Sequence, residues 1–332
     1  MDTLINRLAQ IQKANPLKDI LILHAFSEHL KGILEAQFTQ LNFHYAENTE
    51  QTERLLAQVN PQAVFSISHE KLPAKLLRET GLYPSVKWYH VAGSGIDKML
   101  PWTAENAVMT NGAGVLARYL AETVLGAMLA LNNHVNRYMH QQKAHQWMGH
   151  EFTPLCEQTL LIVGLGAVGE RVADNAKALG MKVIATRRST KGYKNVDQLY
   201  PEDALLNVIG EADFVSLHLP LNEQTHNSFG AKVLSAMKPS ACLINTARGG
   251  IVDEQALHIA LVTGALKGAY FDVFKEEPLP SNSTLWELEN LIITPHMADG
   301  IKGYEKHYLR FFGENIKRWL AVKPLENLKS FD

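Results

Sequence analysis

Four side chains with acid–base or anion-binding chemistry lie in three short segments late in the chain. They are Arg248, Asp272, Glu277 and His296, in the segments NTARGGIVD, DVFKEEPLP and TPHMA. Each segment comes just after a predicted strand, and the carboxyl ends of parallel strands lie along one edge of a sheet. Histidine exchanges protons near neutral pH, and arginine binds carboxylates. We therefore expect these side chains to converge at one site despite their separation in sequence.

A glycine-rich segment indicates where a dinucleotide could bind. The apolar run 160–163 leads directly into Gly164-Leu165-Gly166-Ala167-Val168-Gly169, and a helix-like stretch follows at 170–179. The first glycine permits a tight turn, the second lets the backbone approach a pyrophosphate, and the third lets the helix pack close to the strand. In this strand–turn–helix context the pattern predicts dinucleotide binding rather than a merely structural turn.

The end of the next strand bears on which dinucleotide is bound. This position normally carries a carboxylate for the adenosine ribose 2′-hydroxyl, but the sequence here is Thr186-Arg187-Arg188-Ser189. Arginine forms charge-assisted hydrogen bonds to phosphate, and the two hydroxyls could add further bonds. We predict a preference for NADP(H). The alternative is that both arginines are solvated loop residues and that NAD is accepted equally well.

Short apolar runs alternate with longer amphipathic ones along most of the chain, which is typical of β-α-β units and a parallel sheet. The expected strands are 20–24, 41–45, 63–67, 86–91, 160–163, 182–185, 214–218, 242–245, 269–273 and 291–294. The expected helices are 28–40, 52–59, one or two long helices within 115–146, 170–179 and 304–320.

These elements predict an α/β protein with two doubly wound parallel-sheet domains. A chain of 332 residues exceeds what one hydrophobic core usually organises. We expect a Rossmann dinucleotide-binding domain at 111–299, inserted into a flavodoxin-like substrate domain made of 1–110 and 300–332. The last helix would then pack back on the first domain.

The ordered motifs resemble the D-isomer-specific 2-hydroxyacid dehydrogenase family, which includes glyoxylate/hydroxypyruvate reductases and phosphoglycerate dehydrogenases. The resemblance extends from about residue 88 to 298, and the first eighty residues match only in their pattern. It implies that the arginine before the double glycine, the glutamate before Pro278 and the histidine after Pro295 are catalytic. These residues are Arg248, Glu277 and His296, and Asp272 would be the family's helper aspartate.

The resemblance also implies a role for each group. His296 would exchange the proton of the substrate oxygen, Glu277 would orient its ring and favour the protonated form, and Arg248 would bind the substrate carboxylate. Backbone N–H groups of Gly93, Ser94 and Gly95 would complete the carboxylate site. The expected coenzyme-binding residues are Gly164, Gly166, Ala167, Val168, Gly169, Thr186, Arg187, Arg188, Leu219, Pro220, Thr246, Ala247, Arg248, Asp272 and His296.

The expected function is hydride transfer between NADP(H), or alternatively NAD, and a small 2-oxo/2-hydroxy acid, with glyoxylate or hydroxypyruvate as the leading substrates. A phosphoglycerate dehydrogenase-like or other NAD-dependent enzyme is the first alternative. A formate dehydrogenase is disfavoured because it lacks a glutamate at the position of Glu277. A dinucleotide-sensing, corepressor-like binding protein remains a rival from another class, because fold alone does not define function.

Composition limits the partners and the compartment. The formal net charge of −2 supplies no general attraction to nucleic acid or anionic membrane. From the sequence we expect neither a secretory signal nor a transmembrane segment. We expect Cys156 and Cys242 to be buried free thiols, which suits the cytoplasm, and no metal site. We expect a structural role, in packing or hydrogen bonding, for His90, His134 and His218. By family resemblance we expect a homodimer that uses the long helix after Val115.

Overall fold

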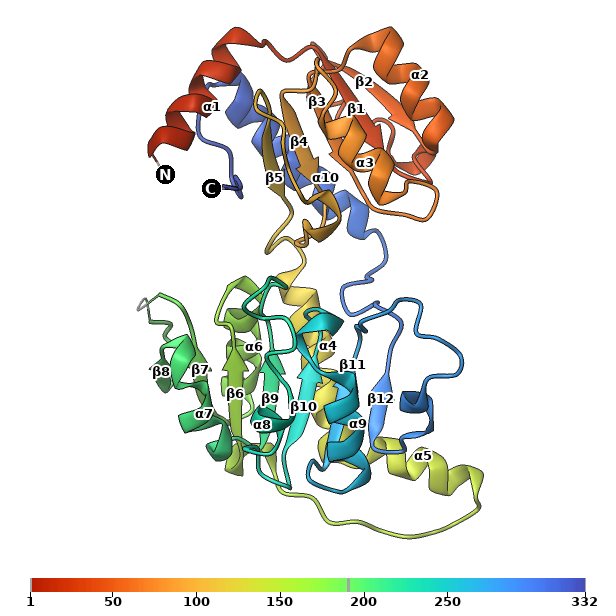
Figure 1. The fold of residues 1–332 in the computed structure, drawn as a ribbon, viewed down its shortest axis with the longest axis vertical. Coiled ribbons are helices and arrows are strands. Elements are labelled where there is room, and N and C mark those ends of the chain that lie inside the picture. The colour runs from red at the N-terminus through yellow and green to blue at the C-terminus, as the bar shows by residue number, and fades with distance from the viewer. Residues whose placement is uncertain (1, 190–191, 332) are drawn as a thin grey trace. The chain divides into compact units, whose positions relative to one another are not determined.

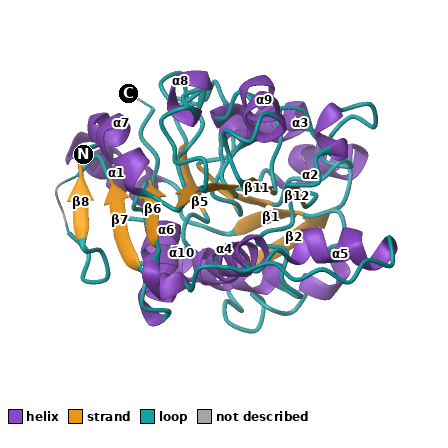
Figure 2. Cartoon of the chain, turned by 90° about the horizontal axis from the view of Figure 1, so that it is seen from below, coloured by secondary structure: helices purple, strands orange, loops and turns teal. Residues whose placement is uncertain are grey.

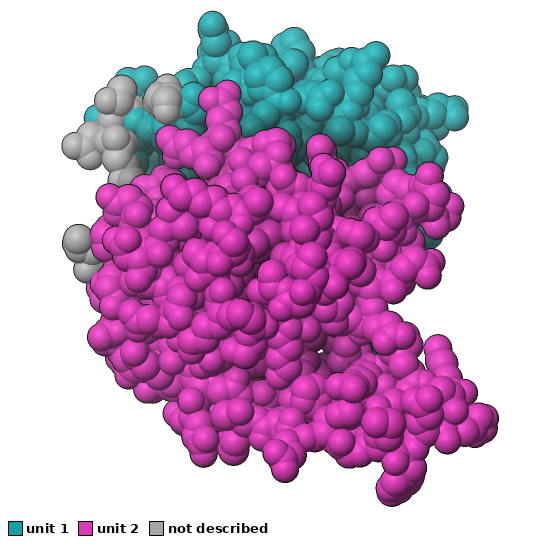
Figure 3. Space-filling view, turned by 60° about the horizontal axis from the view of Figure 1, so that its bottom comes forward, with its two compact units in different colours: residues 1–116, 301–332 teal, residues 117–300 magenta. Residues whose placement is uncertain are grey.

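The computed structural model describes residues 2–189 and 192–331. The chain divides into two compact units (Figure 3). Unit 1 consists of Met1–Leu116 and Ile301–Asp332, and unit 2 of Ala117–Gly300. The chain therefore leaves unit 1, forms the whole of unit 2, and returns to unit 1 for its last helix.

Unit 1 is built on a parallel sheet in the order β2-β1-β3-β4-β5 (Figure 1). This is the flavodoxin-like doubly wound order, in which the strand order reverses between β1 and β3. Its strands are β1 (Asp19–Leu23), β2 (Asn42–Ala46), β3 (Ala63–Ser66), β4 (Trp88–Val91) and β5 (Val108–Asn111). Its helices are α1 (Asp2–Ala14), α2 (Thr49–Val59), α3 (Ala74–Gly81) and α10 (Tyr304–Leu320).

Apolar residues on both faces of this sheet explain why helices cover it twice. On one face, alternate strand residues such as Leu21 and Val64 join Leu56 of α2 and Leu76 of α3 in one buried cluster. On the other face, the Trp88 ring stacks on Trp319 of α10 with ring centroids 5.5 Å apart. The C-terminal helix therefore packs on unit 1, as its pattern of apolar residues predicts.

Unit 2 contains a parallel sheet in the order β12-β11-β10-β9-β6-β7-β8, which is the Rossmann order. Its strands are β6 (Thr159–Val163), β7 (Lys182–Thr186), β8 (Gln198–Tyr200), β9 (Phe214–Leu217), β10 (Cys242–Asn245), β11 (Gly268–Phe271) and β12 (Leu291–Ile293). Its helices are α4 (Ala117–Asn132), α5 (Val135–Lys143), α6 (Ala167–Ala178), α7 (Leu205–Val208), α8 (Ala231–Leu234) and α9 (Glu254–Val262).

Helices cover both faces of this second sheet as well (Figure 2). Leu160 and Ile162 of β6 face a buried cluster that includes residues of α4 and α6. Leu161 and Val163 face the opposite cluster, which includes residues of α8 and α9. The predicted fold class, two doubly wound parallel-sheet domains of α/β type, is therefore confirmed.

Two sequence-based expectations were wrong, those for residues 28–40 and for Cys156. Residues 28–40 do not form a helix: only Glu28–Leu30 form a 3-10 turn, and Gly32 then takes a positive φ of 83°. Of the one or two helices expected within 115–146, the structure has two, because His134 adopts a left-handed φ of 56° between α4 and α5. Cys156 is exposed rather than buried, whereas Cys242 is buried, and both are free.

Several elements carried no clear sequence signal. Helix α1 and the short strands β5 and β8 were not predicted. Strands of three or four residues depend on backbone partners far away in the sequence: β8 pairs with β7, and β5 pairs with β4 and bonds to Asn327 and Lys329. Among the described residues, no helix is both long enough and apolar enough to span a bilayer.

Candidate active site

The glycine segment forms a tight turn between β6 and α6 in unit 2. Gly164 has a φ of +96°, and a Cβ there would lie 2.8 Å from the carbonyl oxygen of His218. A Cβ on Gly169 would lie 2.8 Å from the oxygen of Gly164. Gly166 caps α6 without a side chain, and Ala167 and Val168 begin the helix. The first amides of α6 are therefore open to an anion such as a pyrophosphate.

The glycine turn lies where the strand order of unit 2 reverses, since β9 and β7 flank β6. Open α/β sheets bind ligands at such a point. Leu219 and Pro220 follow β9 directly, while Thr246 and Ala247 follow β10. The Thr246 hydroxyl is buried and finds no hydrogen-bond partner in the part of the chain that the structure describes. A buried polar atom of this kind fits a bound polar ligand.

The two arginines after β7 both carry carboxylate partners. Thr186, the last residue of β7, is buried. The Arg187 Nη1 atom lies 3.3 Å from Glu170 Oε1, and the Arg188 Nε atom lies 3.5 Å from Glu202 Oε2. Sequence reasoning missed both glutamates, because Glu170 lies in α6 and Glu202 follows β8, each more than ten residues from its partner.

The loop that carries Arg248 is fixed by hydrogen bonds of Asn245, a buried residue at the end of β10. Its side chain accepts a hydrogen bond from the Ala247 N–H and donates one to the Arg248 carbonyl, both at 3.1 Å. Gly249 then lies against the backbone of Phe274, where a Cβ would come within 1.9 Å of the carbonyl carbon. Gly249 therefore allows the loop after β10 to lie against the loop after β11.

Asp272 holds the segment that carries His296. Its buried carboxylate accepts hydrogen bonds from the Thr294 hydroxyl at 2.6 Å and from the N–H groups of Met297 and Ala298 at 2.8 and 2.9 Å. Its carbonyl accepts the N–H of His296 at 2.8 Å. Both carboxylate oxygens of Asp272 are thus engaged within the protein, and this residue positions the histidine segment.

His296 and Glu277 form a hydrogen-bonded pair. The His296 Nδ1 atom lies 2.7 Å from Glu277 Oε2, and the Phe274 N–H donates to Glu277 Oε1 at 2.9 Å. The hydrogen bond to Glu277 raises the pKa of His296 above its ordinary value, against the effect of burial. Burial raises the pKa of Glu277, but the hydrogen bonds from His296 and Phe274 outweigh it and leave that pKa lowered.

Proton exchange at this pair would occur at the other ring nitrogen. Because Nδ1 is bonded to Glu277, Nε2 remains as the atom of His296 for a substrate oxygen. The positive charge of Arg248 opposes the rise in the pKa of His296 and adds to the lowering of the pKa of Glu277. All three groups therefore interact electrostatically. The structure therefore brings these three predicted residues together within unit 2.

One carboxyl group near this pair was not predicted. Asp299 lies three residues after His296, and burial raises its pKa, with opposing contributions from His296 and Arg248. The only signal in the sequence was an acidic residue close behind the histidine segment.

The predicted carboxylate-binding loop lies in unit 1, directly after β4. The Gly112 N–H donates to the Gly93 carbonyl at 3.0 Å, and the Asn111 side chain donates to the Ser94 carbonyl. Gly95 follows in the same turn. The carbonyl groups of Gly93 and Ser94 are thus held by the last residue of β5 and the residue that follows it.

The other histidines have structural contacts. The His90 Nδ1 atom lies 2.7 Å from the Thr110 hydroxyl inside unit 1, and burial lowers the pKa of this histidine to about 3. His218 contacts the Ser216 hydroxyl through Nε2 at 2.9 Å, and burial lowers its pKa. The His134 Nε2 atom lies 3.1 Å from the Glu151 carbonyl oxygen.

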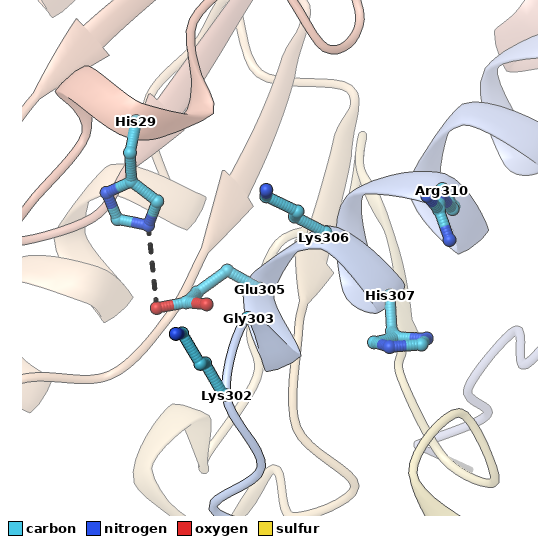
Figure 4. A pocket seen from close by; sticks show the side chains of 7 residues that line it. All are labelled: His29, Lys302, Gly303, Glu305, Lys306, His307 and Arg310. Carbon is cyan, nitrogen blue, oxygen red and sulfur yellow. Dashed lines mark ion pairs between the residues drawn. The ribbon is translucent and has the colours of Figure 1, made fainter.

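A cavity of about 550 Å³ lined mainly by charged side chains lies in unit 1, at the beginning of α10 (Figure 4). Its lining residues are His29, Lys302, Gly303, Glu305, Lys306, His307 and Arg310. The His29 imidazole lies 3.6 Å from the Glu305 carboxylate, while both lysines and the arginine are exposed. Among the described residues, no group of three or more His, Cys, Asp or Glu is placed to hold a metal ion.

Comparison with known proteins gives consistent results. The family model described as "D-isomer specific 2-hydroxyacid dehydrogenase, NAD binding domain" matches residues 125–298. Glycerate dehydrogenase of Methylorubrum extorquens is 31% identical over 310 residues, which cover 88% of this chain and 94% of that protein. Glyoxylate reductase of Korarchaeum cryptofilum is 32% identical over 266 residues, covering 76% of this chain and 78% of that protein.

Among solved structures, a family protein from Aeromonas salmonicida superposes with a TM-score of 0.84 at 31% sequence identity. That match covers 95% of this chain and all of the other chain. The described strand orders, the matched domain and these relatives agree. This chain belongs to the D-isomer specific 2-hydroxyacid dehydrogenase family.

Proposed function

We propose that this enzyme reduces a small 2-oxo acid, with glyoxylate or hydroxypyruvate as the leading substrate and NADPH as the preferred coenzyme. The observation that carries the proposal is the 2.7 Å hydrogen bond between His296 and Glu277 beside the Arg248 loop. A proton donor with a raised pKa and a fixed cation are the two groups that carbonyl reduction of an anionic acid requires. Similarity to a glycerate dehydrogenase and to a glyoxylate reductase supports this substrate class.

In the proposed mechanism, His296 gives its Nε2 proton to the substrate carbonyl oxygen during reduction and takes it back during oxidation. Glu277 holds the ring through Nδ1 and stabilises its protonated form. Arg248 binds the substrate carboxylate and stabilises negative charge on the reacting oxygen. The N–H groups of Gly93, Ser94 and Gly95 would supply further hydrogen bonds to the carboxylate.

The nicotinamide coenzyme would supply the hydride. Its pyrophosphate would bind at Gly166 and the first turn of α6, Ala167 and Val168, with Leu219, Pro220, Thr246 and Ala247 lining the adjacent loops. Arg187 and Arg188, with Thr186, would bind the 2′-phosphate that distinguishes NADP from NAD. The open turn at Gly166 and the unpartnered Thr246 hydroxyl support this placement.

A panel of 2-oxo acids assayed with NADPH and with NADH tests the proposal. We expect the highest kcat/KM for glyoxylate or hydroxypyruvate with NADPH. His296→Ala should lower kcat by about a hundredfold or more, because it removes the proton donor. Unchanged kcat in this variant would refute the mechanism, and a clear preference for NADH would refute the coenzyme assignment.

We also propose that two copies of the chain associate through unit 2. Large apolar side chains are exposed on the segment that begins near the end of α4 and continues through α5 and the loop after it. In a single copy of the chain these side chains are in contact with water. They are Leu129, Val135, Tyr138, Met139, Trp147, Met148 and Phe152. The proposed interface therefore lies along 129–152, further along the chain than the beginning of the long helix.

A further inference from the structure

The ion pair between Arg187 and Glu170 lies where the proposed 2′-phosphate would bind. Arg187 follows β7 directly, and Glu170 stands in the first turn of α6 after the glycine segment (Figure 1). Their Nη1 and Oε1 atoms are 3.3 Å apart, and both side chains are mostly covered, with 21% and 29% of their surfaces exposed. The guanidinium that is proposed to recognise a phosphate thus already interacts with a carboxylate of its own chain.

A phosphate and Glu170 would compete for the same cation. A carboxylate and a phosphate both bind arginine through parallel N–H···O bonds, so Arg187 would have to share or exchange its partner when a phosphate arrives. A ribose 2′-hydroxyl carries no charge and would not compete with Glu170 for the guanidinium in this way.

Contacts of the neighbouring residues limit the competition for the guanidinium to Glu170 and the phosphate. Asp174, one turn further along α6, is already bonded to Arg171, Tyr193 and Asn195. The Arg187 N–H donates to the Tyr200 carbonyl at 3.0 Å, which anchors the arginine backbone independently of Glu170. Loss of the Glu170 charge should therefore change the partner of the guanidinium without displacing the end of β7.

We propose that Glu170 determines how strongly this enzyme discriminates between the two coenzymes, by competing with a 2′-phosphate for Arg187. The inference rests on the proposed function, specifically on Arg187 as the phosphate-binding residue. Glu170 restrains NADP affinity, so the chain accepts NAD more readily than its two arginines alone would allow. Glu170 is a positioning residue in this scheme, because it acts through Arg187.

The second pair after β7 supplies a matched control. The Arg188 and Glu202 side chains are 73% and 44% exposed, and the Nε and Oε2 atoms lie 3.5 Å apart. An ion pair so open to water contributes little. Glu202→Gln removes the same charge as Glu170→Gln from the same region, and we expect it to change coenzyme discrimination less than about twofold, the lower end of the range for exposed pairs.

The experiment is titration calorimetry of the full chain with NADP⁺ and with NAD⁺, without any acid substrate. The proteins are wild type, Glu170→Gln, Glu202→Gln, Arg187→Ala and the double variant Arg187→Ala/Glu170→Gln. In Glu170→Gln we expect the ratio of NADP⁺ to NAD⁺ affinity to rise about three- to fivefold, the size of a partly covered ion pair. In the Arg187→Ala background the same substitution should change the ratio less than about twofold, because the cation for which Glu170 and the phosphate compete is absent.

The outcomes distinguish a failure of the role proposed for Glu170 from a failure of the phosphate-binding role proposed for Arg187. If Arg187→Ala leaves NADP⁺ affinity unchanged, the assignment of the phosphate-binding residue fails, and the inference fails with it. If Arg187→Ala weakens NADP⁺ but Glu170→Gln leaves the ratio unchanged or lowers it, the inference alone is overturned. A rise in the ratio that persists without Arg187, or an equal rise in Glu202→Gln, would likewise overturn competition at Arg187.

Discussion

The hydrogen bond between Glu277 and His296 leads to a prediction about pH at the level of single residues. Glu277 raises the pKa of His296, so the imidazolium persists to higher pH than in an isolated histidine. Reduction requires the protonated ring, and its rate should fall as pH rises through that pKa. In Glu277→Gln the raising effect is lost, so the falling limb of kcat/KM for reduction should move to lower pH. Oxidation, which requires the neutral ring, should extend to lower pH in the same variant.

The measurement is a pH–rate profile in both directions for wild type and Glu277→Gln. Glu276→Gln is the matched control, because the adjacent carboxylate is exposed and is not the one bonded to His296. A profile for Glu277→Gln with lower rates but an unmoved limb would mean that Glu277 orients the ring without setting its pKa.

A second residue-scale prediction concerns stability. Burial lowers the pKa of His90 to about 3, whereas an unfolded histidine titrates near 6.5. As pH falls from about 6.5 toward 3, the unfolded chain binds a proton at His90 that the folded chain does not. The free energy of unfolding must therefore fall with pH in this window, by at most about 1.4 kcal/mol per pH unit from this group.

His90→Asn should flatten this dependence, because asparagine can still bond to the Thr110 hydroxyl but does not titrate. Urea unfolding of wild type and His90→Asn between pH 4 and 8 measures this pH dependence. The other thirteen of the 14 histidines are present in both proteins, so they do not account for a difference in slope. The variant could be less stable at pH 8 through lost packing, so the decisive quantity is the slope. Parallel curves for the two proteins would show that protonation of His90 is not coupled to unfolding.

At the scale of elements, the contact between the loops after β10 and β11 is the most constrained part of the site. A Cβ at Gly249 would lie 2.2 Å from the carbonyl oxygen of Phe274 and 2.4 Å from the N atom of Lys275, and backbone cannot move aside as a side chain can. We expect Gly249→Ala to cost about 2 kcal/mol or more of stability. Because the two loops carry Arg248 and Glu277, kcat should also fall by about a hundredfold.

Gly250→Ala provides the comparison. The Cβ there would meet only the side-chain carbons of Leu221 at 3.2 and 3.3 Å, which can rotate away. Gly249→Ala should therefore lose more thermal stability and more kcat than Gly250→Ala, which thermal unfolding and steady-state kinetics would measure. Equal effects on stability and kcat would contradict a special role for the approach at Gly249.

The sequence was informative about elements wherever local chemistry determines the structure. The glycine turn was predictable because Gly164 and Gly169 are required by the close approach of neighbouring backbone. The convergence of Arg248, Glu277 and His296 followed from their positions after parallel strands. The partners of Arg187 and Arg188 were not predictable, because α6 and the turn after β8 approach these arginines only in the folded domain. The break at His134 likewise lay inside an uninterrupted helical pattern without proline.

At the scale of the whole molecule, the composition of the segment 129–152 argues for assembly. Trp147 is fully exposed, and Met139, Met148 and Phe152 each expose more than half of their surface. Apolar side chains gathered in one segment are stabilised when a second protein surface covers them. We therefore expect a mass of about twice 37.0 kDa in sedimentation at micromolar protein, as a dimer requires.

The double variant Met139→Ser/Trp147→Ser should shift this equilibrium toward monomer without unfolding unit 2, because neither side chain belongs to a buried cluster of that unit. Leu82→Ser in unit 1 is the control: it replaces a similarly exposed apolar residue that is not part of the segment 129–152 and should leave the mass unchanged. Sedimentation velocity over a dilution series distinguishes the variants, and circular dichroism reports whether each remains folded. A wild-type protein that sediments as a monomer at every concentration would show that these side chains do not join two copies, because burying them is the driving force on which the dimer depends.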